Sequence, residues 1–162
     1  DMLIVFALNH PEYRIVYRIR PFKLEQYFKD SEKMGIINDL YDKLKMAKII
    51  IDDYSNTSYE VLLKSKVVVY HTSSLGIEAL GLNKKVLCCN PDKLTYALSQ
   101  ENEMGVLIEN SNKLFEEKLL YLLKNNNNNI KKYYEAKKRK FMNLTNSPID
   151  RILDIIQIKT KV

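Results

Sequence analysis

Short apolar runs rich in β-branched residues recur along this chain of 162 residues, and stretches with helical spacing lie between them. Two of these runs, Val67–Tyr70 and Lys85–Cys89, are almost wholly apolar, as strands are when both faces of a parallel sheet are covered. Their alternation with helices predicts an α/β fold, a Rossmann-like doubly wound parallel sheet with C-terminal helices. The other predicted strands are Tyr13–Ile19, Lys48–Ile51 and Gly105–Ile108.

The predicted helices fill the segments between and after these strands. Five consecutive asparagines have poor helix propensity, so we expect a loop over residues 125–129. We predict a Rossmann-like domain over residues 1–124 and C-terminal helices over 130–162 that pack on the same domain. The predicted helices are Met2–Leu8, Ser58–Ser65, Ser74–Leu82, Ser111–Lys124, Ile130–Leu144 and Pro148–Ile158, and Phe22–Lys45 is predicted to be helical or irregular.

Composition narrows the classes of partner and of chemistry. The net charge of +6 suits anionic partners such as nucleotides, nucleic acid or anionic lipid. Two adjacent cysteines, Cys88 and Cys89, do not make a disulfide framework and favour a reducing, cytoplasmic compartment. Neither Gly-x-Gly-x-x-Gly nor a Walker lysine loop occurs, which argues against dinucleotide oxidoreductases and P-loop NTPases. No metal-ligand spacing is visible, and we expect no cofactor.

The most informative stretch is the polar turn between the strand that ends at Tyr70 and the next predicted helix. Ligands of open parallel sheets bind at the carboxyl ends of strands, where this turn lies. The N-terminus of a helix presents unpaired N–H groups and a positive dipole end, which together bind phosphate. Ser73 and Ser74 add two hydroxyl groups there, so the sequence predicts a phosphate site at these serines.

Glu78 is the one charged residue between Thr72 and Leu82. It follows Ser74 by four residues, which places both side chains on one face of the predicted helix. An acid in an otherwise apolar helix needs a partner, and the two hydroxyl groups of a ribose would serve. The alternative is a structural acid beside an N-cap serine, paired with a buried Lys or Arg.

The segment Ser73–Val86 reads Ser-Ser-x-x-x-Glu-Ala-Leu-x-Leu-x-Lys-x-Val and resembles the core of the C-terminal domain of GT-B glycosyltransferases. The likeness is strongest to bacterial capsule and surface-polysaccharide enzymes, including polysialyltransferases and the glycerophosphotransferases of teichoic acid synthesis. The resemblance implies that Ser73 and Ser74 bind the nucleotide phosphate, that Glu78 binds the ribose and that no metal is needed. It also implies that residues 1–124 bind a nucleotide sugar and that an N-terminal acceptor domain is missing, so this fragment would be inactive alone.

A second element resembles a basic-x-His-Pro motif of several such families, in which the histidine contacts phosphate or assists the leaving group. Here the strand ends in Arg18-Ile19-Arg20-Pro21, with Arg20 in place of the histidine. An arginine can hold phosphate permanently but cannot act as a general acid. We therefore expect Arg18 and Arg20 to bind phosphate, and the alternative is two solvated arginines at a strand end.

Three further residues are candidates for the same site. His71 lies beside the serines and is a candidate for a catalytic or phosphate contact, or else a turn residue bonded to the backbone. Asp53 and Tyr54 follow another predicted strand and are candidates for binding the base, on which Tyr54 could stack. The alternative there is that Asp53 or Ser55 caps the next turn.

The stretch Lys131–Lys140 contains six basic residues, two tyrosines and one acid. It predicts either a solvated helix face or peripheral contact with anionic lipid at the inner face of the membrane. We do not expect nucleic acid as a partner. The function expected is nucleotide-sugar binding within a glycosyltransferase. The alternatives are an isomerase similar to nucleotide-sugar 2-epimerases, and a non-enzymatic domain that binds nucleic acid or membrane through the basic stretch.

Overall fold

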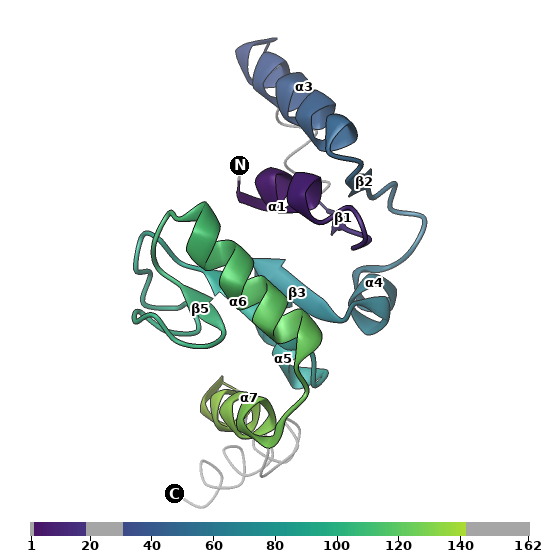
Figure 1. Cartoon of the computed structure of the whole chain (residues 1–162). Helices are drawn as coiled ribbons and strands as arrows, with labels where there is room; N and C mark the ends of the chain where they lie inside the picture. The colour runs from purple at the N-terminus through teal and green to yellow at the C-terminus, as the bar shows by residue number, and fades with distance from the viewer. Residues whose placement is uncertain (1, 19–30, 142–162) are drawn as a thin grey trace, which may run out of the picture. The chain divides into compact units, whose positions relative to one another are not determined.

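The structure, a computed structural model, describes residues 2–18 and 31–141. These residues form the predicted α/β, Rossmann-like fold in a small and partial form, with short parallel strands and helices between them (Figure 1). The chain divides into two compact units. Unit 1 comprises Asp1–Val61 and Asn110–Glu117, and unit 2 comprises Leu62–Glu109 and Lys118–Val162. The predicted strands accordingly lie in two sheets, one of two strands and one of three.

Unit 1 contains the two-stranded sheet. Strand β1 pairs in parallel with β2, with Val16 opposite Ile50 and Tyr17 opposite Ile51. Both strands are shorter than the sequence predicts, because each forms ladder bonds with one partner over two residues only. The elements are α1 (Met2–Asn9), β1 (Val16–Tyr17), α3 (Ser31–Met46) and β2 (Ile50–Ile51).

The late start of β2 has a local cause in the way α3 ends. Lys48 has a φ of 56°, in the left-handed region. The backbone N–H of Ile49 donates to Leu44 O at 2.9 Å, and that of Lys48 donates to Lys45 O at 2.9 Å. This is the pattern of a Schellman motif, in which a left-handed residue closes the helix. Lys48 therefore belongs to the helix end, and the strand predicted from Lys48 begins at Ile50.

The core of unit 1 joins α1 to α3 and to the sheet. Ala7, Leu44, Ala47 and Ile49 form its buried cluster. Phe6 is also buried, and its ring lies 6.1 Å from that of Phe115 in an edge-to-face arrangement. The predicted helix Met2–Leu8 is thus confirmed, one residue longer.

Unit 2 contains the three-stranded sheet, in the order β3-β4-β5, with all strands parallel. Val67 pairs with Lys85 and Tyr70 with Cys88, so β3 and β4 have the predicted bounds. Helices α4 and α6 cross the boundary between the units. The elements are α4 (Ser58–Lys64), β3 (Val67–Tyr70), α5 (Ser74–Gly81), β4 (Lys85–Cys89), β5 (Val106–Leu107), α6 (Asn112–Lys124) and α7 (Asn128–Phe141).

The sheet of unit 2 is the centre of its core. Val86, Leu87 and Val106 are fully buried, as strands covered on both faces require. Helix α5 contacts β3, β4 and α7. Both cysteines are free, with Cys88 buried and Cys89 half-buried.

Helix α7 begins inside the asparagine run. The side-chain Oδ1 of Asn127 accepts from the N–H of Ile130 at 3.0 Å, as an N-cap does. Asn128 and Asn129 are therefore helical, and the predicted helix over Ile130–Leu144 starts two residues earlier than expected. The predicted helix Pro148–Ile158 lies outside the described residues.

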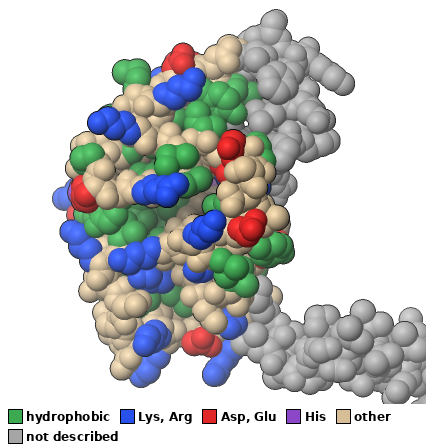
Figure 2. Space-filling view, turned by 90° about the vertical axis from the view of Figure 1, so that its right-hand side faces the viewer, with side chains coloured by type: hydrophobic (Ala, Val, Ile, Leu, Met, Phe, Trp, Pro, Cys, Tyr) green, Lys and Arg blue, Asp and Glu red, His purple; other side chains and the backbone are tan. Residues whose placement is uncertain are grey.

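Among the residues described, no helix has the length and apolar character needed to span a bilayer. Figure 2 shows basic side chains in several parts of the face that it draws, with apolar side chains between them. The most exposed large apolar residues include Met46 at 79% and Ile36 at 65%.

Candidate functional site

The turn between β3 and α5 presents its polar side chains to solvent. His71, Thr72 and Ser74 are exposed, and Ser73 is half-buried. Ser73 is the N-cap of α5, with φ −85° and ψ 132°, and its hydroxyl oxygen accepts from the N–H of Leu75 at 3.3 Å. One hydroxyl oxygen thus satisfies one N–H of the first turn, and Ser74 is the first residue of the helix.

A glycine in the first turn of α5 brings this helix close to the end of β3. A Cβ added to Gly76 would overlap the ring of Tyr70, so the close approach requires a residue without a side chain. The hydroxyl of Tyr70 is buried and has no hydrogen-bond partner among the described residues. Burial, with the neighbouring Cys88 thiol as a lesser cause, raises the pKa of Tyr70.

Glu78 lies on α5 one turn after Ser74, and its side chain is half-buried. The helix ends just beyond it, where Asn83 takes a φ of 59° and the N–H of Lys84 donates to Ala79 O at 3.0 Å. This Schellman motif fixes the length of α5. The helix face predicted to carry both Ser74 and Glu78 is therefore present, and the ribose role of Glu78 stays a prediction.

The loop after β4 adds a residue that the sequence does not single out. His71 Nε2 lies 3.3 Å from Asp92 Oδ2, and the two side chains are 47% and 64% exposed. Because β3 and β4 are parallel neighbours, the loops after them lie at the same sheet edge. Asp92 can therefore orient the imidazole of His71 beside the serines.

Asn90 holds the loop that carries Asp92. Its side chain is fully buried, its Oδ1 accepts from the N–H of Leu94 at 2.8 Å, and its Nδ2 donates to Ser99 O at 2.9 Å. The N–H of Asn90 donates to Leu107 O at 2.7 Å. A buried amide with its groups satisfied in this way fixes the loop, as a structural role requires.

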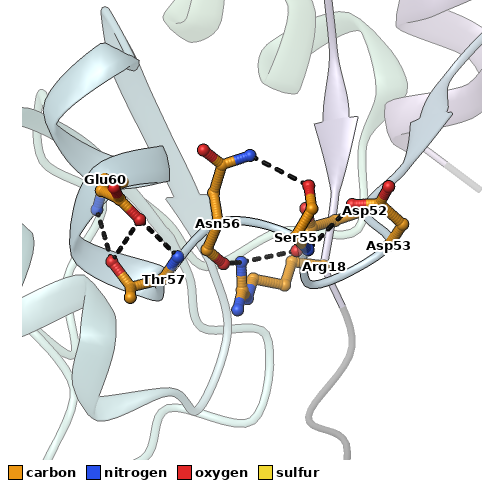
Figure 3. Close-up of polar contacts among 7 residues, drawn as sticks. All are labelled: Arg18, Asp52, Asp53, Ser55, Asn56, Thr57 and Glu60. Carbon is orange, nitrogen blue, oxygen red and sulfur yellow. Dashed lines mark hydrogen bonds and ion pairs between the residues drawn. The ribbon is translucent and has the colours of Figure 1, made fainter.

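The loop after β2 is organised by an ion pair (Figure 3). Arg18 Nη1 lies 2.5 Å from Asp52 Oδ2, with the side chains 20% and 7% exposed. The same nitrogen donates to Asn56 O at 3.0 Å, and the guanidinium lies 4.9 Å from the centre of the Tyr54 ring. Arg18 is thus not solvated. It ties the end of β1 to the β2–α4 loop.

The rest of that loop is also held by its own side chains. The N–H of Ser55 donates to Asp53 Oδ1 at 3.0 Å, which confirms the alternative that Asp53 caps a turn, and these bonds from Ser55 lower the pKa of Asp53. At the start of α4, Glu60 Oε2 accepts from the N–H of Thr57 at 2.7 Å, and the N–H of Glu60 donates to Thr57 Oγ1 at 3.3 Å. This reciprocal pair is a capping box.

The predicted site residues fall into two groups. His71, Ser73, Ser74 and Glu78 lie together in unit 2. Arg18, Asp53 and Tyr54 lie together in unit 1, and Arg20 lies outside the described residues. Tyr54 has a φ of 61°, and burial raises the pKa of its hydroxyl.

Other chemistry has little support in the described residues. No three His, Cys, Asp or Glu side chains of residues 2–18 and 31–141 are grouped to hold a metal ion. Burial raises the pKa of Cys89 to about 12, so its thiol is a poor nucleophile near neutral pH. A hollow of about 180 Å³ in unit 1 is lined mainly by apolar side chains, with Lys48 as its one charged residue, and includes none of the predicted site residues. It lacks the convergent polar groups of a ligand site.

Comparison of the chain with models of protein families, with curated proteins and with solved structures finds no match.

Proposed function

We propose that this chain is the nucleotide-sugar-binding part of a glycosyltransferase that makes surface or capsular polysaccharide. The observation that carries the proposal is the exposed polar turn at the carboxyl end of β3, which leads directly into α5. Ser74 begins this helix and Glu78 follows one turn later on the same face. A nucleotide bound there would place its phosphate at the serines and its ribose at Glu78.

The chemistry proposed for the turn is electrostatic. The Ser73 hydroxyl accepts from the N–H of Leu75, which leaves its proton to donate to a phosphate oxygen. Ser74 and the N-terminal N–H groups of α5 add donors, and preorganised donors stabilise a phosphate leaving group as the glycosidic bond breaks. We assign no phosphate contact to Arg18, because its guanidinium already balances the charge of Asp52.

His71 and Asp92 would complete this edge of the site. An imidazole that Asp92 orients can contact the phosphate without acting as the base for the acceptor. That base would come from the acceptor domain, so the chain is expected to bind nucleotide, without a metal, and to transfer nothing. The cytoplasm, where nucleotide sugars are made, is the proposed compartment.

The proposal is tested by calorimetric titration of the chain with CMP, CDP, UDP and GDP. We expect one of these bases to be preferred, and Glu78→Gln to weaken that nucleotide by on the order of 10-fold or more, as lost hydrogen bonds to a charged group do. Glu135→Gln is the matched control, because Glu135 is an exposed acid on another helix. If no nucleotide binds the folded chain, or if both variants bind like the unmodified chain, the site is not the one proposed.

A further inference from the structure

The basic residues of α7 are divided between two sides of the helix. Lys137 is 14% exposed, and its Nζ lies 2.5 Å from Glu103 Oε2. Lys138 Nζ donates to Asn83 Oδ1 at 2.7 Å. These two cations attach α7 to other parts of unit 2, and Glu103 balances the charge of Lys137.

The other four cations face solvent. Lys131, Lys132, Arg139 and Lys140 are exposed, and their spacing places them on one half of the helix. Within residues 2–18 and 31–141, no ion pair involves any of the four. The one acid on this outward face is Glu135. We call the four cations and Glu135 the outward face of α7.

The two tyrosines of α7 lie on its opposite side, and its third aromatic residue, Phe141, ends the helix with the centre of its ring 5.6 Å from Lys140 Nζ. Tyr134 is buried, and its hydroxyl donates to Val86 O at 2.6 Å. The hydroxyl of Tyr133 donates to Glu103 Oε2 at 2.9 Å. The exposed uncharged residues of the helix are Asn128, Asn129 and Ala136, so none of the fully exposed residues of α7 is aromatic or large and apolar, and the half-buried Phe141 lies beside Lys140 alone.

We propose that the outward face of α7 binds the surface of an anionic lipid bilayer. Each Lys or Arg near such a surface contributes about 1 kcal/mol, and the attraction falls off within a Debye length. Without large apolar side chains the helix would rest on the headgroups and would not insert, so binding should depend strongly on salt. The proposal does not rely on the nucleotide site.

The same features disfavour nucleic acid as the partner. Proteins that bind single strands stack bases on exposed aromatic rings, and both tyrosines of α7 are turned inward. A duplex offers phosphates at fixed spacing, and Glu135 interrupts the row of Lys131 and Arg139 that would have to match them. Anionic lipids diffuse laterally and can gather around cations in any arrangement.

The test is co-sedimentation of the chain with phosphatidylcholine vesicles that contain about 30% phosphatidylserine, a composition chosen to give a negative surface potential. We expect the triple variant Lys131→Gln, Lys132→Gln, Arg139→Gln to bind on the order of 100-fold more weakly, since three charges at about 1 kcal/mol each are lost. Lys45→Gln, Lys66→Gln, Lys93→Gln is the matched control, with the same net charge on other elements, and should bind within about twofold of the unmodified chain.

A second variant tests the same face in the other direction. Glu135→Gln removes its one acid and should strengthen binding by about fivefold. The proposal is overturned if the chain binds pure phosphatidylcholine equally well, or if the two triple variants lose the same affinity. It is also overturned if duplex or single-stranded nucleic acid at the same salt binds more tightly than the vesicles. Nucleotide titration of the α7 variant should be unchanged, which separates this test from that of the nucleotide site.

Discussion

The loops after β2 and after β3 occupy the same place in their sheets, at the end of a parallel strand and before a helix, yet they treat their polar groups differently. After β2, Asp53 and Glu60 accept hydrogen bonds from residues of the loop, and Asp52 pairs with Arg18. After β3, His71, Thr72 and Ser74 are exposed, and Ser73 makes the cap. A loop that satisfies its own groups holds its shape, whereas an exposed polar loop has groups to offer a ligand.

The contrast extends to the helices that follow. Helix α4 begins with a capping box that uses two reciprocal bonds, and α5 begins with one serine and has Gly76 where the box would place an acid. An acid at that position would compete with a bound anion for the same N–H groups. Its absence keeps the N-terminus of α5 electropositive, which is why the proposed phosphate site lies after β3.

The largest expected effect breaks the closed loop. Arg18→Met leaves the buried carboxylate of Asp52 unpaired, and removing one partner of a buried pair costs about 3 kcal/mol of unfolding free energy. Urea denaturation measures the loss, with the exposed Arg14→Met as control. Arg18→Met combined with Asp52→Leu should recover much of the stability. Equal losses in Arg18→Met and Arg14→Met would show that the ion pair does not hold the loop.

The next effect concerns the packing beneath the open loop. Gly76→Ala forces a methyl group into the ring of Tyr70 and should destabilise the protein by about 2 kcal/mol, a usual cost of overpacking. The matched change Gly35→Ala lies in a helix with no atom near the new methyl group and should stabilise by about 1 kcal/mol. Thermal unfolding compares the two, and the same sign for both variants would contradict the close approach at Gly76.

A smaller effect compares the caps directly. Thr57→Ala removes a hydroxyl that accepts from the N–H of Glu60 at 3.3 Å and donates to Glu60 Oε2 at 2.9 Å, and we expect a loss of about 1.5 kcal/mol. Ser73→Ala removes a single bond to the N–H of Leu75 and should cost about 1 kcal/mol. Chemical denaturation of both variants measures the difference. A larger loss for Ser73→Ala would reverse the order that we assign to the two helix starts.

The smallest effect distinguishes the two histidines by pH. His10 Nε2 lies 2.9 Å from Glu116 Oε1, and Glu116 chiefly raises the pKa of His10 above 6.5, while the bonds from His10 and Asn9 lower the pKa of Glu116 below 4.5. The raised histidine pKa contributes stability that is full below 6.5 and is lost as pH rises through the folded pKa. The lowered carboxylate pKa contributes stability that is full above 4.5 and is lost as pH falls.

Thermal stability should therefore gain most from the His10 pair between about pH 4.5 and 6.5. His10→Gln should lower the melting temperature most within this window and progressively less at higher pH. His71→Gln is the control, because His71 lies in an exposed loop. A melting-temperature difference for His10→Gln that does not vary with pH would indicate that the packing of the His10 ring, and not its charge, stabilises the protein.

The sequence predicted the elements of unit 2 better than those of unit 1. The runs Val67–Tyr70 and Lys85–Cys89 are apolar along their length, and a strand that pairs throughout its apolar run has the bounds of that run. The lengths of β1 and β2 depend on each other and on the way α3 ends at Lys48, and neither is encoded in the local pattern. The sequence showed that polar residues follow each strand, but it did not show which of them form hydrogen bonds within the loop and which are exposed.

The Arg18–Asp52 pair depends on the register between β1 and β2. Tyr17 lies opposite Ile51, so the next residue of each strand meets the other, and the N–H of Asp52 donates to Tyr17 O at 2.9 Å. Opposite charges directly after two neighbouring strands were a signal that could have found this pair. The orientation of α7 could not be predicted from its composition, because only tertiary contacts show that Lys137 is paired with Glu103 whereas Arg139 is exposed.

The contacts between His10 and Glu116 and between Phe6 and Phe115 also bear on how the protein is made. His10 and Glu116 are 106 positions apart along the chain. At a translation rate of 5 to 20 residues per second, the apolar helix α1 would wait roughly 5 to 20 s on the ribosome before its partners on α6 are synthesised. Unit 1 therefore completes its folding only once α6 is made, although α1 can pack earlier on α3 and the two-stranded sheet through Ala7.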